Sequence, residues 1–277
     1  KLSNKININA NNNEQVSIIY PKSTQEISQQ LSTTTNQQTK IAVVCGGHSA
    51  SNVATWPYHH NEQQSQPTII LDMKEMSTIS INKQSNEVTI GGGVLFKQLA
   101  EICANEGKAL PIGTGDTVGV CGYILNGGIS GYFGKRLGML GQRVTQLEIV
   151  LANGNVKTLS NACTNDEDRD LFRACLGAGS ALGVVTSLTI QMEDDTCFQT
   201  GGSLVFACLD KDTAKPFLKK ALRFMTEHVL PNDDVSMEIV ITSDYTIICT
   251  FMFFTIRLME VQMNTYNLYV TWQRIAR

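Results

Sequence analysis

A histidine that follows two glycines at the end of an apolar run is the part of this sequence best suited to chemistry. Residues 41–44, Ile-Ala-Val-Val, predict a buried strand, and Gly46 and Gly47 lie directly before His48. Two glycines let backbone N–H groups converge on an anion. A turn with a surface histidine gives the same pattern, so the functional interpretation depends on the rest of the chain. The pattern indicates a candidate site for an anionic cofactor.

The second unusual segment is residues 111–134, in which glycines alternate with apolar residues. The glycines are too dense for the interior of a helix or strand, so we expect irregular backbone here. Val118, Val120, Ile124 and Leu125 make the segment apolar enough to be buried. Buried irregular backbone needs hydrogen-bond partners, and a planar ligand with a polar edge would supply them.

Ordinary elements must position these two segments. We expect a strand at 16–20, a helix opened by the capping box Ser23-x-x-Glu26, strands at 40–44 and 68–71, a hairpin of 79–81 with 88–90, and a helix between Leu95 and Gly107. After the glycine-dense segment we expect a hairpin of 146–151 with 156–159 around Asn153-Gly154, a helix at 170–175 and a strand at 184–192. The order of elements predicts an α+β fold.

The two ends of the chain differ from its middle. Residues 1–14 are polar and rich in asparagine, which predicts a flexible arm. From 196 onward we expect strands at 203–208, 235–242 and 246–254 and an amphipathic helix at 212–229, which together are typical of a substrate-covering layer. Residues 255–277 show no clear period.

Composition excludes several classes of function. A formal net charge of −3 gives no electrostatic footprint for nucleic acid or an anionic membrane, and no apolar run reaches the roughly 18 residues of a membrane span. The eight cysteines show no Cys-x-x-Cys spacing, so we expect no metal site and no disulfide framework. The absence of an Asn-x-Ser/Thr sequon disfavours a glycosylated secreted protein, and localisation otherwise stays unknown with a slight preference for intracellular.

With these segments in hand, the sequence resembles the vanillyl-alcohol-oxidase type of flavoproteins, in particular the berberine-bridge-enzyme-like branch. The resemblance covers about residues 15–195 and rests on a colinear series of motifs: Pro21-Lys-Ser-Thr24, Gly46-Gly-His-Ser49, Leu71-Asp72, residues 79–93, Thr117-Val-Gly-Val120, Gly127-Gly128, residues 147–154 and Gly183-Val-Val-Thr186. It implies a flexible arm at 1–14, a two-subdomain PCMH-type FAD-binding domain at 15–195, and a partial, truncated antiparallel-sheet substrate domain at 196–277.

The resemblance also assigns roles to residues. The backbone of residues 45–49 would hold the FAD pyrophosphate, with Val44 just before it, residues 115–123 would pack around the flavin and ribityl chain, and 183–185 would lie at the adenine end. By position these are Val44, Cys45, Gly46, Gly47, His48, Ser49, Gly115, Asp116, Thr117, Val118, Gly119, Gly122, Tyr123, Gly183, Val184 and Val185. His48 matches the histidine that bonds covalently to the flavin, because a neutral imidazole is a good nucleophile. His59, His60 and His228 have no such context and are expected at the surface.

Departures from the family pattern limit what the resemblance implies. Gly115 stands where doubly linked members have a cysteine, so we expect no thioether link, and Cys121 is interpreted as a small buried residue rather than a flavin ligand. Val44 stands where an arginine is common, which would loosen the phosphate contacts. The family continues well beyond the length of this chain and carries its usual catalytic base there, so no catalytic residue is named.

The implied activity is that of an FAD-dependent oxidoreductase. Its substrate would be an alcohol-bearing small molecule, a sugar or a secondary metabolite, and dioxygen or another acceptor would reoxidise the flavin. The alternative is a truncated, non-catalytic flavin-binding relative with a structural or interaction role. The short second half and Val44 favour the alternative, whereas His48 and the glycine-dense segment favour the enzyme.

Overall fold

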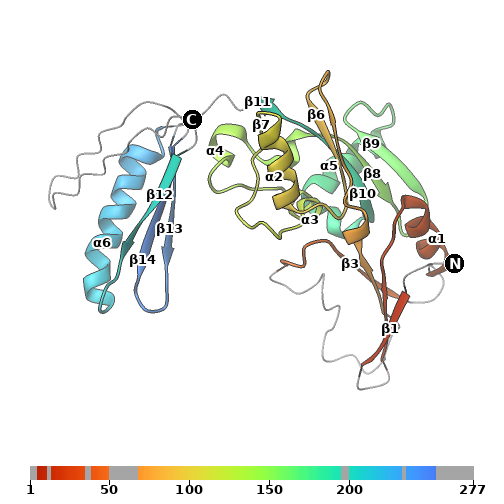
Figure 1. Cartoon of the computed structure of the whole chain (residues 1–277), viewed down its shortest axis with the longest axis horizontal. Helices are drawn as coiled ribbons and strands as arrows, with labels where there is room; N and C mark the ends of the chain where they lie inside the picture. The colour runs from red at the N-terminus through yellow and green to blue at the C-terminus, as the bar shows by residue number, and fades with distance from the viewer. Residues whose placement is uncertain are drawn as a thin grey trace. The chain divides into compact units, whose positions relative to one another are not determined.

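The computed structural model describes residues 5–10, 14–34, 39–49, 68–194, 200–232 and 235–253. Two compact units divide the chain, unit 1 comprising Lys1–Asp195 and unit 2 comprising Thr196–Arg277. Figure 1 shows the elements of each unit in the colours of chain order. The predicted surface histidines His59 and His60 and the stretch 255–277 lie outside the described residues.

The first sheet of unit 1 has four strands in the order β1-β2-β4-β3. The strands are β1 (Lys5–Ala10), β2 (Glu14–Ile19), β4 (Thr68–Asp72) and β3 (Lys40–Val44). β2, β4 and β3 run parallel, and β1 pairs antiparallel with β2. The flexible arm predicted for residues 1–14 is therefore wrong for β1. Its sequence Lys-Ile-Asn-Ile-Asn-Ala alternates apolar and polar residues with the period of a strand, a signal that the polar composition concealed.

Helix α1 (Thr24–Thr34) connects β2 to β3 and begins at the predicted cap. The Glu26 amide donates to Ser23 Oγ at 3.3 Å, and the Glu26 carboxylate accepts from the Lys22 amide at 3.0 Å. Ile27 and Leu31 face a core cluster with residues of both main sheets of unit 1. The buried members of this cluster are Ile19, Ile27, Leu31, Ile69, Leu71, Met73, Val150 and Val184. α1 therefore holds the parallel sheet against the second sheet.

The second sheet has five strands in the order β5-β6-β10-β8-β9, and each neighbouring pair is antiparallel. The strands are β5 (Ile79–Asn82), β6 (Glu87–Gly91), β10 (Val184–Gln191), β8 (Val144–Val150) and β9 (Val156–Ser160). The predicted hairpin between β8 and β9 is confirmed, and Gly154 has a φ of +84°, which a glycine adopts without strain. The predicted hairpin between β5 and β6 is confirmed as well.

Helices α2 (Phe96–Asn105), α3 (Val120–Leu125) and α5 (Asp166–Ala178) contribute to the larger core, which also takes side chains from the second sheet. Phe96, Leu99, Ile124 and Phe172 are among its fully buried side chains. α2 ends as predicted, with Gly107 at a φ of +63° just after it. α5 begins at the Asn165 cap and is longer than the predicted helix at 170–175.

The glycine-dense segment is not wholly irregular. Val120–Leu125 form α3 and Gly134–Leu137 form the short helix α4. The expectation of irregular backbone throughout 111–134 is therefore wrong for these residues. Val120, Ile124 and Leu125 of α3 are buried, so packing of one apolar face outweighs the low helix propensity of Gly122.

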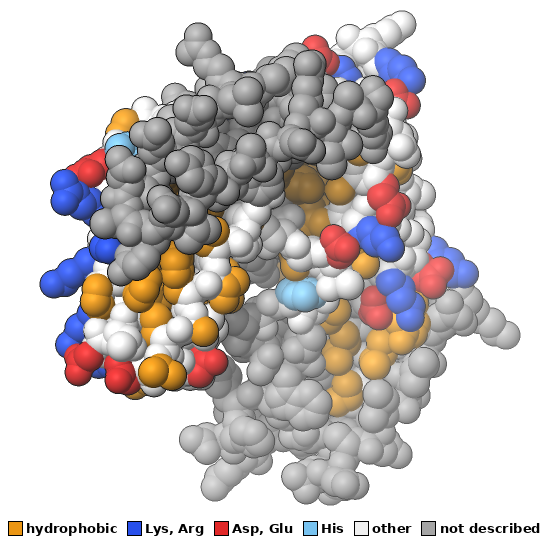
Figure 2. Space-filling view, turned by 60° about the vertical axis from the view of Figure 1, so that its left-hand side comes forward, with side chains coloured by type: hydrophobic (Ala, Val, Ile, Leu, Met, Phe, Trp, Pro, Cys, Tyr) orange, Lys and Arg blue, Asp and Glu red, His pale blue; other side chains and the backbone are white. Residues whose placement is uncertain are grey.

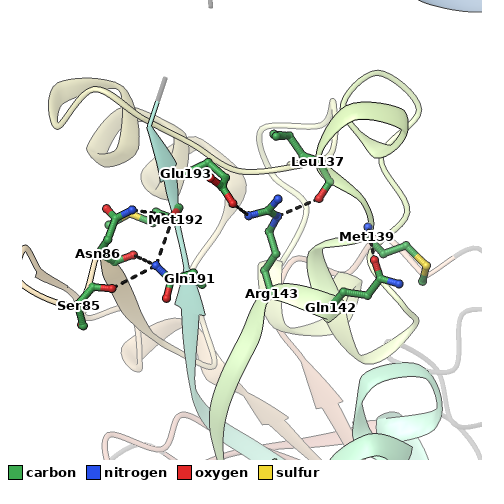
Figure 3. A network of polar contacts seen from close by, with 9 residues as sticks. All are labelled: Ser85, Asn86, Leu137, Met139, Gln142, Arg143, Gln191, Met192 and Glu193. Atoms are coloured by element: carbon green, nitrogen blue, oxygen red, sulfur yellow. Dashed lines mark hydrogen bonds and ion pairs between the residues drawn. The ribbon is translucent and has the colours of Figure 1, made fainter. Parts of the chain in front are cut away.

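Polar contacts hold the last described residues of unit 1, as Figure 3 shows. Arg143 joins Glu193 through Nη1 and Oε1 at 2.6 Å and donates through Nε to the Leu137 carbonyl at 2.9 Å. Gln191 donates to the Asn86 carbonyl at 2.9 Å. The two-residue strands β7 (Lys108–Ala109) and β11 (Glu193–Asp194) pair beside this network.

Unit 2 is a three-stranded antiparallel sheet in the order β12-β14-β13 with one long helix. The strands are β12 (Thr200–Phe206), β14 (Ile247–Phe253) and β13 (Val235–Ile241). α6 (Lys211–Phe224) lies along one face of this sheet and continues into a π-helical turn at Met225–Val229 (Figure 1). The elements predicted for this region are confirmed, with shifts of a few residues at their ends.

Charges of both signs are interspersed over the face drawn in Figure 2. Among the residues described, no helix combines the length and the apolar character needed to cross a bilayer. Within the same residues, no group of histidine, cysteine and acidic side chains is arranged to hold a metal ion.

Candidate functional site

The glycine-histidine loop lies at the carboxyl end of three parallel strands. β3 ends at Val44, which pairs in register with Asp72, the last residue of β4. Ile19, the last residue of β2, pairs with Leu71 of β4. Residues 45–49 therefore leave the sheet at the edge where open parallel sheets bind ligands. Gly47 has a φ of +70°, so a residue with a side chain would be strained there.

Close backbone contact joins this loop to the glycine-dense segment. A Cβ on Gly46 would lie 2.3 Å from the Thr117 carbonyl oxygen and 2.4 Å from the Gly119 nitrogen. A Cβ on Gly119 would lie 2.3 Å from Cys45 Sγ. Only glycine fits at both positions, because neither backbone can withdraw without moving its strand or helix. The structure thus brings together two predicted segments that are about 70 residues apart in sequence.

The segment 115–119 is itself held by the start of α2. Val118 donates from its amide to the Gly115 carbonyl at 3.1 Å, which closes a tight turn. The Phe96 amide donates to the Val118 carbonyl at 3.0 Å, and the Lys97 amide donates to the Asp116 carbonyl at 3.0 Å. These bonds satisfy backbone groups of the turn, and the Val118 side chain packs against Gly115. Asp116 and Thr117 are exposed on its outer side.

His48 reaches across this junction. Its Nε2 lies 2.7 Å from the Thr117 hydroxyl oxygen, and the imidazole is exposed. The bond orients the ring and uses Nε2, so Nδ1 is the nitrogen without a partner among the described residues. His48 is therefore an oriented, accessible histidine rather than a core histidine with both nitrogens satisfied.

Tyr123 lies one turn into α3 with its ring against Phe96, at 4.9 Å between centroids in an edge-on arrangement. Its hydroxyl is buried and has no hydrogen-bond partner among the described residues. Burial raises the pKa of Tyr123, and the nearby Ser130 hydroxyl opposes that rise. The Ser130 hydroxyl donates its hydrogen to the Ile112 carbonyl at 2.8 Å. The phenol is thus an unused polar group inside the predicted flavin-contacting segment.

Two cysteines lie near this junction, Cys45 half-buried and Cys121 buried. Burial and the carboxylate of Asp72 raise the pKa of Cys45 to about 12. Cys45 Sγ lies 3.6 Å from the Val94 carbonyl oxygen. Burial raises the pKa of Cys121 strongly, and its Sγ lies 4.0 Å from the Val185 carbonyl oxygen. Neither thiol is poised to ionise, which supports the structural interpretation of Cys121.

The third predicted segment, 183–185, differs from the other two. Val184 and Val185 are buried and pair with Val150 and Ile149 of β8, so their side chains belong to the core. A Cβ on Gly183 would lie 2.6 Å from the Val150 carbonyl oxygen. The structure brings this segment beside α3 through the contact of Val185 with Cys121, but no described contact joins it to residues 45–49. Its contact with adenine stays a prediction.

Lys74 and Tyr20 also lie at the carboxyl edge of the parallel sheet, although the sequence patterns did not single them out as site residues. Tyr20 follows β2 directly, and Lys74 follows β4 by two residues. The Lys74 ammonium lies 3.9 Å from the centroid of the Tyr20 ring. In the sequence, both residues come at or just after the end of a predicted apolar strand, which could have indicated a position at the sheet edge. Their proximity depends on the parallel pairing of the two strands.

The described residues fit FAD. Glycines at 46, 47 and 119 leave a side-chain-free backbone at the carboxyl edge of parallel strands, which suits a pyrophosphate. Gly122 has open space where a Cβ would stand, and the Tyr123 hydroxyl is a buried polar group without a partner among the described residues. A planar group with polar edges matches both.

Comparison with known proteins gives the same result. The model of the FAD binding domain family matches residues 17–160, and the chain belongs to this family. (R)-6-hydroxynicotine oxidase of Paenarthrobacter nicotinovorans is 30% identical over 201 residues, which is 72% of this chain and 41% of that protein. The FAD-linked oxidoreductase tazG of Aspergillus terreus is 37% identical over 154 residues, covering 56% of this chain and 28% of that protein. The chain thus spans less than half the length of these curated relatives.

Solved structures show the same fold. Physcomitrella patens BBE-like 1 superposes with a TM-score of 0.74 at 21% identity, covering 87% of this chain and 49% of that one. The 6-hydroxy-D-nicotine oxidase of Arthrobacter nicotinovorans superposes with a TM-score of 0.69 at 25% identity, covering 88% of this chain and 51% of that one. The expected α+β architecture, a PCMH-type FAD-binding domain followed by an antiparallel sheet, is confirmed. FAD is the cofactor of the family.

Proposed function

We propose that this chain is the FAD-binding part of an oxidoreductase that oxidises an alcohol-bearing small molecule, such as a sugar or a secondary metabolite. The observation that carries the proposal is the backbone junction of Gly46 with Gly119, across which His48 contacts Thr117. Relatives named as FAD-linked oxidoreductases and as a hydroxynicotine oxidase support the reaction class. A chitooligosaccharide oxidase and a xylooligosaccharide oxidase among the fold neighbours are compatible with a carbohydrate substrate.

Each predicted segment has a task in this proposal. Residues 45–49 hold the pyrophosphate through backbone N–H groups, and residues 115–123 pack against the flavin and ribityl chain. His48 forms the single covalent bond to the flavin, with Thr117 orienting its ring through Nε2. Val44, Cys45 and Ser49 flank the loop, while Val118 and Tyr123 line the flavin side. Gly183, Val184 and Val185 provide backbone at the adenine end.

Bound FAD would supply the hydride acceptor for oxidation of an alcohol to a carbonyl compound, with the hydroxyl proton passing to a base. Dioxygen or another acceptor completes the cycle. The contribution of unit 1 is to bind and orient the cofactor, because its loops rest on paired strands and a packed helix. We assign residues 196–277 to a partial substrate-binding domain built on the sheet β12-β14-β13 with α6 on one face.

The test is to purify the chain with FAD, record its flavin absorbance, and mix it anaerobically with primary alcohols, mono- and oligosaccharides, and hydroxylated aromatic compounds. Bleaching of the flavin by one of these classes supports the oxidoreductase and names its substrate class. A chain that stays yellow with every class supports the non-catalytic alternative. A chain that binds no flavin contradicts both.

A further inference from the structure

The edge at which residues 45–49 leave the parallel sheet lacks an obvious cation. The loop Cys45-Gly-Gly-His-Ser49 contains neither lysine nor arginine, and Val44 before it is apolar. A pyrophosphate carries two negative charges, whereas backbone N–H groups at a turn supply partial positive charge only. A cation from another element would strengthen binding at this edge, an argument that rests on the proposed function.

Lys74, two residues beyond the end of β4, is a cation at this edge. Tyr20 and Asp72 hold its side chain, with the ammonium 3.9 Å from the centroid of the Tyr20 ring and 4.0 Å from Asp72 Oδ2. Asp72 Oδ1 also accepts from the Lys74 amide at 3.1 Å, which fixes the backbone turn after β4. The Tyr20 ring attracts the Lys74 charge through its π face, so this contact does not use the ammonium N–H groups in a conventional hydrogen bond. The Lys74 side chain stays 56% exposed, so its donors are accessible.

Two neighbours of Lys74 connect the turn after β4 with the glycine-histidine loop. Asp72 pairs in register with Val44. Burial is the main cause of the raised pKa of Cys45, and the nearby Asp72 carboxylate raises it further. On the other side, a Cβ on Gly93 would lie 3.2 Å from Lys74 Cα, and the neighbouring Val94 carbonyl accepts from Cys45 Sγ. The backbone at Lys74 and the loop therefore lie at one edge of the sheet, with the ammonium over Tyr20 at the end of β2.

We propose that Lys74 binds the pyrophosphate of FAD in this chain, with Tyr20 and Asp72 as the residues that position its ammonium. Asp72 would repel the pyrophosphate if it stood alone, and Lys74 offsets its charge. The distance of 4.0 Å is longer than a direct charge-assisted hydrogen bond, so the ammonium is not committed to Asp72 and can donate to a phosphate oxygen. The competing explanation is that Lys74 serves only to neutralise Asp72.

Binding measurements on the 277-residue chain separate these explanations. His48→Ala is the background, because a covalent bond would otherwise hide the affinity. Dissociation constants are measured by fluorescence quenching for FAD and riboflavin and by calorimetry for ADP and adenosine. We expect Lys74→Gln to weaken FAD and ADP about tenfold, the usual effect of removing one charged hydrogen bond, and to leave riboflavin and adenosine unchanged. The salt dependence of FAD binding should fall with it.

Matched variants exclude a general effect on folding. Lys83→Gln removes an equal charge from the β5–β6 turn, where Lys83 pairs with Glu106, and should leave all four affinities unchanged. Lys74→Arg should retain FAD affinity, and Lys74→Met should reproduce Lys74→Gln while keeping the aliphatic stem against Tyr20. An unchanged FAD affinity in both neutral variants, or an equal loss for adenosine and riboflavin, overturns this inference alone. Failure of the unsubstituted chain to bind FAD overturns the proposed function as well.

Discussion

Units 1 and 2 differ in how much of their structure rests on a packed core. Unit 1 encloses two clusters of buried side chains, and the larger one joins the five-stranded sheet to three helices. In unit 2 the corresponding cluster has three buried members, Ala214, Ile247 and Cys249, and Leu209 and Leu230 are exposed. Both segments that meet at the candidate site belong to unit 1. The loops expected to hold the cofactor are therefore supported by the unit with the larger packed core, which is better able to keep them rigid.

The largest effect is expected from a core substitution in unit 1. Phe172 of α5 is fully buried, so Phe172→Ala should lower the free energy of unfolding by about 4 kcal/mol through lost burial and a cavity. Phe217 of α6 is 37% exposed, and Phe217→Ala should cost about 1 kcal/mol. Urea unfolding followed by circular dichroism measures both. Equal losses would contradict the difference between the units.

A methyl group at the junction of the two site segments should have the next largest effect. Gly46→Ala places a Cβ against the backbone of Thr117 and Gly119, and it should destabilise the chain by about 3 kcal/mol and abolish FAD binding. Gly177→Ala is the control, because Gly177 lies in α5 and has nothing within 4 Å of its Cβ position. That change should be neutral or slightly stabilising. Normal FAD binding by Gly46→Ala would show that the close contact does not shape the site.

The covalent bond proposed for His48 predicts that flavin retention depends on a histidine of unit 1 and not on a histidine of unit 2. Acid precipitation of the FAD-loaded chain should leave the flavin with the protein pellet, and His48→Ala should release it to the supernatant. His228, exposed in the π-helical turn of unit 2, supplies the matched histidine, and His228→Ala should keep the colour in the pellet. Colour that stays in the pellet with His48→Ala would assign the bond to another residue, with Cys45 and Cys121 as the first to test.

The smallest effect concerns acid stability. The Thr145 hydroxyl donates to Glu87 across the second sheet at 2.7 Å and holds the pKa of Glu87 below its usual 4.5. A carboxylate with a lowered pKa stabilises the fold above its unfolded pKa, and this contribution is lost as pH falls through the folded value. Thr145→Val should therefore raise the pKa of Glu87, seen by NMR titration, and flatten the acid side of the stability profile.

Unit 2 offers a matched pair in which the effect on stability should vanish. Thr242 lowers the pKa of Asp244, but the two residues are neighbours in one hairpin turn. Contacts this local persist in unfolded chains, so the folded and unfolded pKa values differ little. Thr242→Val should raise the pKa of Asp244 without changing the acid side of the stability profile. A change as large as that of Thr145→Val would contradict this reasoning.

Sequence patterns were sufficient for most elements of both units. The apolar runs of β5, β6, β8 and β9 predicted two hairpins, and Asn153-Gly154 marked the turn of the second, because Gly154 accepts left-handed backbone. The capping box at Ser23 predicted the start of α1, because the hydrogen bonds of a cap join residues within one turn. Prediction failed where composition and context competed. Asparagines concealed β1, and glycines concealed α3, whose helix is held by burial of Val120 and Ile124.

The sequence by itself determined that residues 45–49 and 115–119 are glycine loops between apolar elements, because φ preference and hydrophobic period are local properties. Only the tertiary structure decided that Gly46 and Gly119 touch, that His48 contacts Thr117, and that Lys74 stacks on Tyr20. The order β1-β2-β4-β3 brings Tyr20, Lys74 and residues 45–49 to one edge, and packing of the segment before α3 against Gly46 adds Thr117 and Gly119, up to about a hundred positions from Tyr20. Strand order and helix docking result from burial summed over the whole core, and no local window of sequence contains that sum.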